Sequence, residues 1–492
     1  MKNTFALVNR TPPEVLSLIP DYVEDSERNE ASITLTHVCR GWRELFISRP
    51  SLWARLDCRS IEKTRVYIDR SKNSPLEIHL DGHYIPSYCE EAFLLAVPHA
   101  SRVKTLSAIG WLPSDSPALL QTLVEQFSRP VPLLEKLKID VLCTTPTLPT
   151  TLFNGDVSSL RELSLTGILM PPSWMGLGNL TIFNLCDLPD YKIPLTHLLD
   201  FFESAPRLRD IRLRNSIPHH SDAPPERIVP LPNLIKLKTI GHPVNSVLLN
   251  HLSIPSGASV ALVFTFRGPI LPFPAHIPDT LDNLDNISRI ATINLCFGPD
   301  RRAMRLNGPS GELCVLGNWA GEAARPHTDT PRFLRFLNRF DTSRCRQLGI
   351  SQCRFQQDLL TSVPIKLWST YQFLFSMGDL RVLTLIESFN LPFILTLNPD
   401  KTPDKIVLCP KLEDIILYVN LSGGVHIDEL LSMTEERASR GAKLSTITIV
   451  STCALTPTME VFRLRNHVSR VEYKFDNAPP AWDGHAQFES NS

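Results

Sequence analysis

The sequence lacks the features that mark several large classes of protein. Its 492 residues carry 50 basic and 51 acidic side chains, a net charge of −1. There is therefore no overall excess of positive charge of the kind that attracts nucleic acids or anionic membranes. No window approaches the roughly 18 to 20 apolar residues that a membrane-spanning helix needs. We expect neither a nucleic acid nor a membrane as a partner.

Cysteine pairing motifs are also missing. The eleven cysteines form no Cys-x-x-Cys pair and no His/Cys spacing typical of zinc sites. The segment Met1–Phe5 contains no apolar signal core. These features predict reduced thiols in an intracellular protein, cytoplasmic or nuclear, with no metal and no other cofactor.

Catalytic motifs are absent as well. The sequence has no glycine-rich phosphate loop, Gly-x-Ser-x-Gly elbow, His-Glu-x-x-His helix or aspartate-rich metal loop. Gly423-Gly424 lacks a following Lys-Ser, and His219-His220 lies among prolines and serines, which is typical of a solvated loop. Cys345 and Cys353 flank a strand-like segment, where we expect small buried residues rather than nucleophiles. We predict no catalytic residue and no enzyme.

The composition is that of an ordered protein, 43% hydrophobic and 21% charged. Near the N terminus, six apolar residues have the spacing of one helix of about three turns, which Pro50 would end. They are Leu35, Val38, Cys39, Trp42, Leu45 and Phe46. Trp53 follows the proline, where its indole can fold back onto the helix. Upstream, Pro12-Pro13-Glu14 can open a second helix over Val15 to Ile19.

These residues resemble the F-box, whose pattern is roughly Leu-Pro-x-Glu-(Leu/Ile)-Leu-x-x-Ile-Phe, a spacer, Val-Cys-(Lys/Arg)-x-Trp and a later Leu-Trp. The matching residues are Pro12, Glu14, Val15, Leu16 and Ile19 in the first half, and Val38, Cys39, Arg40, Trp42, Leu52 and Trp53 in the second. Thr11 stands where the family has leucine and Pro20 where it has phenylalanine, which shortens the first helix. The resemblance implies docking to a Skp-family adaptor by residues that contact it or frame its site: Pro12, Leu16, Ile19, Leu35, Val38, Cys39, Trp42 and Trp53.

Beyond residue 100 one six-residue phrase recurs, with apolar residues at its first, fourth and sixth positions. It starts at Leu134, Leu160, Leu180, Leu208, Leu234, Ile290, Leu380, Leu412 and Leu444, with weaker copies at Val103, Cys345 and Val468. From 134 to 234 the starts lie 26, 20, 28 and 26 residues apart. The alternation in the second half of the phrase predicts a strand with one buried face, and such strands stack into a parallel sheet.

Helices and breakers fit between the phrases. Apolar stripes predict helices that run from Leu195 to Pro206, from Thr330-Pro331 to Phe340, and from Ile427 to Gly441. Prolines lie two residues before a phrase at Pro132, Pro206, Pro232 and Pro410, where they stop a helix. Residues 298–329 interrupt the period, and Asn307 to Gly311 is a turn signal, so we expect an inserted β-hairpin.

The phrase resembles the strand segment of leucine-rich repeats, in the irregular form that follows an F-box in many fungal proteins. The expected fold is therefore α/β: a short all-α F-box followed by a curved leucine-rich-repeat-like solenoid with a parallel sheet. We expect an F-box-like helical domain over 1–58, a connecting segment over 59–99, the repeat array over 100–477 and a flexible tail over 478–492.

The resemblance implies a substrate receptor of a Skp–cullin–F-box ubiquitin ligase, which binds the adaptor and cullin complex at one end and an unidentified target protein along the array. Thr11 and Pro20 favour an alternative, a protein-binding scaffold whose degenerate F-box recruits no ligase. An ordinary α/β domain with scattered strands, or an α/β enzyme with an unrecognised site, are further alternatives.

Overall fold

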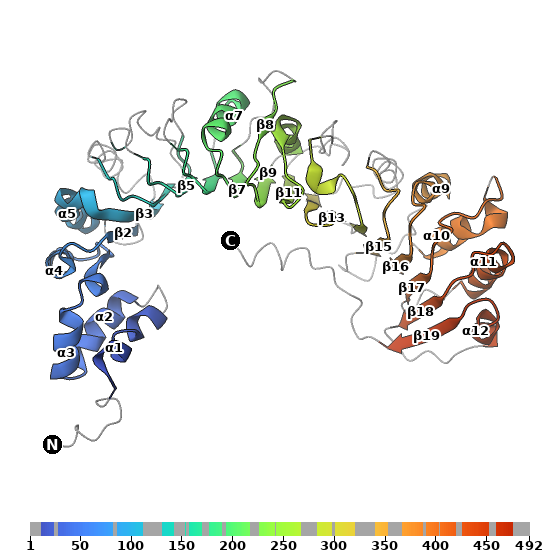
Figure 1. The fold of residues 1–492 in the computed structure, drawn as a ribbon, viewed down its shortest axis with the longest axis horizontal. Helices are drawn as coiled ribbons and strands as arrows, with labels where there is room; N and C mark the ends of the chain where they lie inside the picture. Colours follow the sequence, from blue (N-terminus) through green and yellow to red (C-terminus); the bar gives the residue numbers. More distant parts are fainter. Residues whose placement is uncertain are drawn as a thin grey trace. The chain divides into compact units, whose positions relative to one another are not determined.

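The structure of the protein is a computed structural model. It describes residues 11–23, 28–81, 86–111, 130–141, 153, 157–169, 177–188, 193–216, 226–241, 243–266, 283–297, 301–319, 340–352, 367–386, 390–402, 404–419, 426–451 and 459–475. The chain divides into two compact units, Met1–Ser216 and Ile217–Ser492. Both units are mixed α/β and contain a large, mostly parallel sheet (Figure 1).

The first unit opens with short helices: α1 (Pro13–Leu16), the 3-10 helix η3 (Ile19–Tyr22), α2 (Arg28–His37), α3 (Arg40–Ile47) and the 3-10 helix η4 (Pro50–Trp53). The prediction of one helix over the stripe Leu35 to Phe46 is wrong. The helix is interrupted at Val38, and the backbone is extended at Cys39, with φ −159° and ψ 174°. Local hydrogen bonds account for the break. The Cys39 carbonyl accepts from the Arg43 amide (2.9 Å) to start α3, while Arg43 Nε donates to the Thr36 carbonyl (3.0 Å) and satisfies the end of α2.

Next come β1 (Arg55–Leu56), α4 (Ile61–Ser71), β2 (Leu76–Asp81), α5 (Pro86–Ala96) and the 3-10 helix η5 (Val97–Arg102). Ser60 caps α4 by accepting from the Lys63 amide at 3.3 Å. The sheet continues through β3 (Val103–Trp111), β4 (Lys136–Val141), β5 (Glu162–Thr166), β6 (Ile182–Cys186) and β7 (Asp210–Arg214), with α7 (Leu195–Ser204) between the last two. Strands β1 to β7 pair in chain order, and every pair is parallel.

The repeated phrase fixes the register of these strands. Its fourth residue pairs with the fourth residue of the next phrase, so that Leu137, Leu163, Phe183 and Ile211 form one row. Each of these four side chains is fully buried. Burying a large apolar side chain stabilises a fold by about 1.5–3 kcal/mol, so the row is a major part of the core.

The same tight turn precedes each of the five phrases from Leu134 to Leu234. The amide of the first residue donates to the carbonyl three residues earlier, as from Leu160 to Val157 (3.1 Å) and from Leu208 to Ala205 (3.2 Å). A proline at the second position of such a turn fits this geometry, as Pro206 does. These turns therefore make the strands that follow them begin at the same level of the sheet.

The second unit contains β9 (Lys236–Gly241), β11 (Ser259–Phe266), β12 (Thr292–Phe297), β13 (Arg301–Asn307), β14 (Glu312–Trp319), β15 (Gln347–Gln352), β16 (Val382–Ile386), β17 (Asp414–Val419), β18 (Thr446–Ser451) and β19 (Arg470–Phe475). Their order in the sheet is β9, β11, β14, β13, β12, β15 and then β16 to β19 in sequence. Smaller elements are β8 (Val229–Pro230), which pairs with β10 (Leu252–Ser253), and the 3-10 helices η7 (Pro243–His251) and η9 (Asp285–Ile287).

The hairpin predicted within 298–329 is confirmed as β13 and β14. Strand β13 is antiparallel to both of its neighbours, and the hairpin is inserted between β11 and β12. Glu312 fixes it in place, because its carboxylate accepts from Arg305 Nε (2.9 Å) and Ser259 Oγ (2.7 Å). Its carbonyl accepts from Asn286 Nδ2 at 2.8 Å.

After the hairpin, helix and strand alternate as the sequence predicts. The helices are α9 (Leu367–Phe375), α10 (Asn390–Leu397) with the 3-10 helix η11 (Pro399–Lys401), α11 (Ile427–Ser439) and α12 (Met459–Leu464). They lie in a row alongside β16 to β19 (Figure 1). The predicted helices at 195 and 427 are confirmed, and Gly441 ends α11 with φ +80°. Most of the helix predicted from Thr330 lies outside the described residues. None of the helices in the described ranges combines the length and the apolar character that spanning a bilayer requires.

Candidate docking helices and strand-edge groove

The N-terminal helices are joined to α4 through Trp53, which is 1% exposed. Its Nε1 donates to the Phe46 carbonyl at 2.9 Å, and its ring meets that of Tyr67 edge-on at 5.1 Å. The Arg70 guanidinium lies 4.4 Å from the indole centroid. The hydroxyl of Tyr67 lies 2.5 Å from Ser32 Oγ on α2. The indole therefore packs back onto α3 as the sequence predicts, and it links α2 and α3 to α4, which lies between β1 and β2.

The predicted adaptor-binding residues are divided between the interior and the surface. Four are buried (Leu16, Leu35, Trp42 and Trp53), two are half-buried (Ile19 and Cys39) and two are exposed (Pro12 and Val38). The buried four pack inside the helical segment itself, as Trp42 does against Phe46 with ring centroids 5.6 Å apart. Their side chains can frame a docking surface but do not form one.

The exposed apolar residues of this segment are different ones. We call them the N-terminal apolar set: Val15 (52% exposed), Leu18 (47%), Tyr22 (86%), Ile33 (39%) and Val38 (49%). Sequence reasoning did not select Val15, Leu18, Tyr22 or Ile33 as docking residues. The sequence feature that could have indicated this surface is Tyr22, an aromatic residue at the start of the charged segment 21–30. Apolar side chains gathered on a small helical segment are a usual mark of a protein-binding surface.

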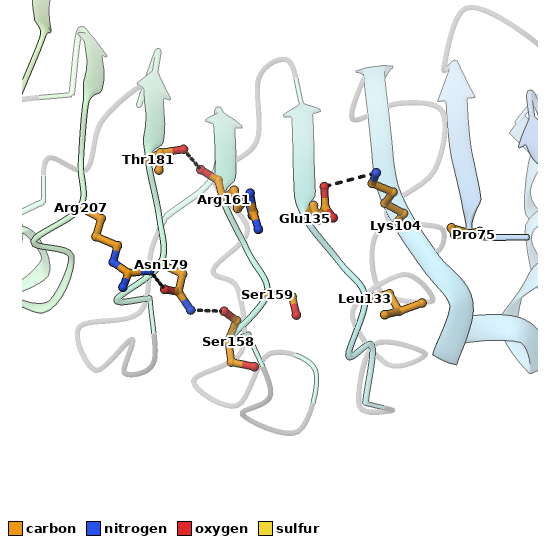
Figure 2. Close-up of a pocket in the computed structure, with 10 residues that line it drawn as sticks. All are labelled: Pro75, Lys104, Leu133, Glu135, Ser158, Ser159, Arg161, Asn179, Thr181 and Arg207. Atoms are coloured by element: carbon orange, nitrogen blue, oxygen red, sulfur yellow. Dashed lines mark hydrogen bonds and ion pairs between the residues drawn. The ribbon is translucent and has the colours of Figure 1, made fainter.

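A groove lies along the edge of the first unit where the strands begin (Figure 2). Its volume is about 530 Å³. Pro75, which precedes β2, lines one end of it. The other lining residues belong to the turns and first positions of successive phrases: Lys104, Leu133, Glu135, Ser158, Ser159, Arg161, Asn179, Thr181 and Arg207. Because the strands are in register, the same phrase positions recur side by side along the groove.

Hydrogen bonds across neighbouring turns organise the polar side chains of the groove. Asn179 donates from Nδ2 to the Ser158 carbonyl (2.7 Å), and its Oδ1 accepts from Arg207 Nη1 (2.5 Å). Thr181 Oγ1 donates to the Arg161 carbonyl at 3.0 Å. Figure 2 shows these bonds running from one turn to the next. The turns therefore hold Arg207 in position before any ligand binds.

The groove is locally positive in a chain whose net charge is −1. It contains three cationic side chains and one carboxylate, that of Glu135, which pairs with Lys104 Nζ at 3.5 Å. Within the described part of the chain, the Arg161 guanidinium makes no ion pair or hydrogen bond, and Figure 2 shows it between the starts of β4 and β5. Arg161 is exposed and available to an anion.

A second polar cluster lies at the opposite ends of the strands. Asp187 accepts from Arg214 and from Asn215 Nδ2 (2.8 Å), beside Cys186 and Asp140. Burial raises the pKa of Cys186 and of Asp140, the reverse of what an activated thiolate needs. The cluster therefore offers no nucleophile.

Three further thiols are equally unsuited to nucleophilic chemistry. Burial raises the pKa of Cys314, Cys345 and Cys409 to about 12 in each case. Cys345 is thus buried as expected, while Cys353, His219-His220 and Gly423-Gly424 lie outside the described residues. Cys296 is disulfide-bonded, which departs from the expectation that every cysteine is a free thiol. No group of three or more metal-ligating side chains comes together in the described ranges.

No model of a known protein family matches this chain, and no curated protein matches it.

Proposed function

We propose that this protein is a substrate receptor of a Skp–cullin–F-box ubiquitin ligase. The N-terminal helices, residues 11–58, dock on a Skp-family adaptor, and the array of phrases behind them binds a target protein. In this role the chain supplies proximity, because it holds the target near a ubiquitin-charged enzyme elsewhere in the complex, and it catalyses nothing itself.

The observation that carries the proposal is the N-terminal apolar set. Five large apolar side chains are exposed between residues 15 and 38, while Leu16, Leu35, Trp42 and Trp53 are buried in the same segment. Fully burying one such side chain against a partner is worth about 1.5–3 kcal/mol. A handful of anchors of this kind is typical of the centre of a protein interface.

The finer architecture belongs to the same proposal. We take the strands as the sheet of an irregular leucine-rich-repeat solenoid. One strand per phrase, pairing in register and a repeated turn before most of the phrases all support this interpretation. Such arrays present long surfaces that bind other proteins.

A second candidate is a binding scaffold that recruits no ligase. Helix α1 has only four residues, and four of the eight predicted docking residues are buried within their own unit. Under this alternative, the helices serve to cover the end of the sheet at β1, to which Trp53 and α4 attach them.

Co-purification of the tagged full chain with a Skp adaptor tests the proposal. Val15→Glu combined with Leu18→Glu introduces two charges into the N-terminal apolar set and substitutes no buried residue. We expect this double variant to capture at least tenfold less adaptor than the wild type. Ile235→Glu combined with Phe462→Glu is the matched control, because both residues are exposed apolar residues of the second unit (41% and 51%). This pair should capture adaptor like the wild type.

Variants of buried residues are less informative here. Leu16→Ala and Trp42→Ala would remove capture by unfolding the helices, whatever surface binds the adaptor. The proposal fails if wild type recovers no adaptor above an empty-tag control, or if the Val15/Leu18 double variant recovers as much as wild type. The first of these results would leave the scaffold as the better account.

A further inference from the structure

We propose that the strand-edge groove of the first unit binds an extended acidic peptide segment of the target protein, with carboxylates about three residues apart. The inference rests on the proposed function only in taking the array as the target-binding part of the chain. It does not depend on adaptor docking.

The charges of the groove select the class of ligand. The guanidinium of Arg161 makes no ion pair or hydrogen bond among the described residues, and that of Arg207 is hydrogen-bonded to Asn179. Lys104 pairs with Glu135, which is the single acidic residue that lines the groove. A guanidinium binds a carboxylate through two parallel hydrogen bonds, which suits arginine to acidic partners. An overall neutral chain with a small positive groove fits a peptide rather than a long polyanion such as RNA, which needs a wide basic surface.

The spacing of the cations defines the spacing of the acids. Lys104 lies on β3, Arg161 immediately before β5, and Arg207 before β7, so that a cation stands at every second strand. Neighbouring strands are about 4.8 Å apart, which places the strands that carry these cations roughly 10 Å from one another. An extended peptide advances about 3.3 Å per residue. A chain crossing the strand starts therefore meets a cation at about every third residue.

The turns provide the neutral contacts between these points. Ser158 and Ser159 lie between the cations, on the turn before Leu160, and Leu133 adds an apolar side chain that is 46% exposed. A segment of about seven residues would occupy the groove from Lys104 to Arg207. The expected pattern is Glu-x-x-Glu-x-x-Glu with small polar residues between the acids.

The binding of two labelled peptides to the full chain tests this inference by fluorescence anisotropy. One peptide is Glu-Ser-Ser-Glu-Ser-Ser-Glu, and the control has the same composition with its three glutamates contiguous. We expect the spaced peptide to bind at least fivefold more tightly than the contiguous one. Binding should weaken further at 1 M salt, where charges are screened beyond about 3 Å.

Variants of the groove locate the binding. Arg161→Ala combined with Arg207→Ala should lower affinity for the spaced peptide at least tenfold. Arg346→Ala is the matched control, because Arg346 is exposed and has the same phrase position before β15 that Arg161 has before β5. It should change nothing, and thermal melting of all variants checks that the fold is kept.

Three results would overturn the inference: equal binding of the two peptides, an unchanged affinity in the double arginine variant, or stronger binding of a single-stranded RNA of the same length. Adaptor capture by the same arginine variants separates this inference from the proposed function. If the peptide fails to bind while the adaptor is captured, only the groove is refuted. If the peptide binds while no adaptor is captured, only the ligase role is refuted.

Discussion

Trp53 determines how firmly the N-terminal helices are attached to the rest of the first unit, and its replacement gives a quantitative prediction. The indole is 1% exposed and makes three specific contacts: the Nε1 bond to the Phe46 carbonyl (2.9 Å), the edge-on packing on Tyr67 (5.1 Å) and the stacking under Arg70 (4.4 Å). A receptor that must hold a target in one position relative to its adaptor needs this joint to be rigid.

Trp53→Phe keeps the aromatic contact with Tyr67 and removes the indole N–H. A net hydrogen bond contributes about 0.5–1.5 kcal/mol. The Phe46 carbonyl also accepts from the Arg49 amide at 3.3 Å, so it is not left without a donor. Adding about 1 kcal/mol for the smaller ring gives an expected loss of about 1.5–2.5 kcal/mol in the free energy of unfolding of the first unit.

Trp53→Ala removes the ring altogether, and large-to-small changes of this kind in a core cost about 3–5 kcal/mol. Urea unfolding followed by far-UV circular dichroism measures both losses, and limited proteolysis within residues 28–60 reports on the joint itself. In a double-mutant cycle, Trp53→Phe and Arg70→Met should show a coupling free energy of about 0.5–1 kcal/mol. Losses below 0.5 kcal/mol for Trp53→Phe and below 1.5 kcal/mol for Trp53→Ala would refute the account of this joint.

Three further predictions concern the second unit. Arg437 is fully buried and donates to the carbonyls of Leu408 (2.7 Å) and Cys409 (2.9 Å). Arg437→Met should therefore lower the free energy of unfolding by about 2–5 kcal/mol in chemical unfolding, while Arg463→Met, at an exposed position, should lower it by under about 0.5 kcal/mol. Equal effects of the two substitutions would contradict this. A Cβ at Gly311 would collide with the Ser256 and Ala258 carbonyls, so Gly311→Ala should lower stability by about 2 kcal/mol, whereas Gly257→Ala, which has open space, should be nearly neutral. Because the pKa values of Cys314, Cys345 and Cys409 are about 12, iodoacetamide at pH 8 should modify these thiols only after unfolding. Since these pKa values in the folded protein lie above the ordinary thiol value of 9.0, the stability they contribute is fully present below pH 9 and is lost as the pH rises from 9 towards 12. Rapid labelling of the folded protein, or an unfolding midpoint unchanged between pH 8 and 10.5, would argue against this burial.

The repeated phrase was the most informative part of the sequence, because it combines a turn with a half-buried strand. All twelve copies lie on strands, from β3 to β19, and ten of them pair in the expected parallel sense with a following strand of the sheet. In β9 the phrase pairs with β11, which is not a copy: its segment Val260 to Phe264 is continuously apolar and lacks the alternation. Strand β2, within the expected connecting segment, was missed for a different reason. It alternates as a strand should, but its turn and leading leucine differ from the phrase.

Other features depend on contacts that no local pattern encodes. The pairing of β14 with β11 joins segments more than 50 residues apart, and the hairpin turn alone does not specify where the hairpin inserts. In the N-terminal helices, apolar spacing identified residues such as Leu35 and Trp42 but not the direction in which they face. The groove was likewise unpredictable, since Arg161 and Arg207 come together only once the register of the strands is known.

Hydrogen–deuterium exchange of the full chain, with and without a purified Skp-family adaptor, tests the central proposal most directly. The proposed docking predicts slower exchange of amides in α1, η3 and α2 and at the adjoining Leu18 and Val38, which together hold the N-terminal apolar set. It predicts unchanged exchange in β4 to β7. Protection confined to the strands, or no protection anywhere at saturating adaptor, would contradict a receptor that docks through its N-terminal helices.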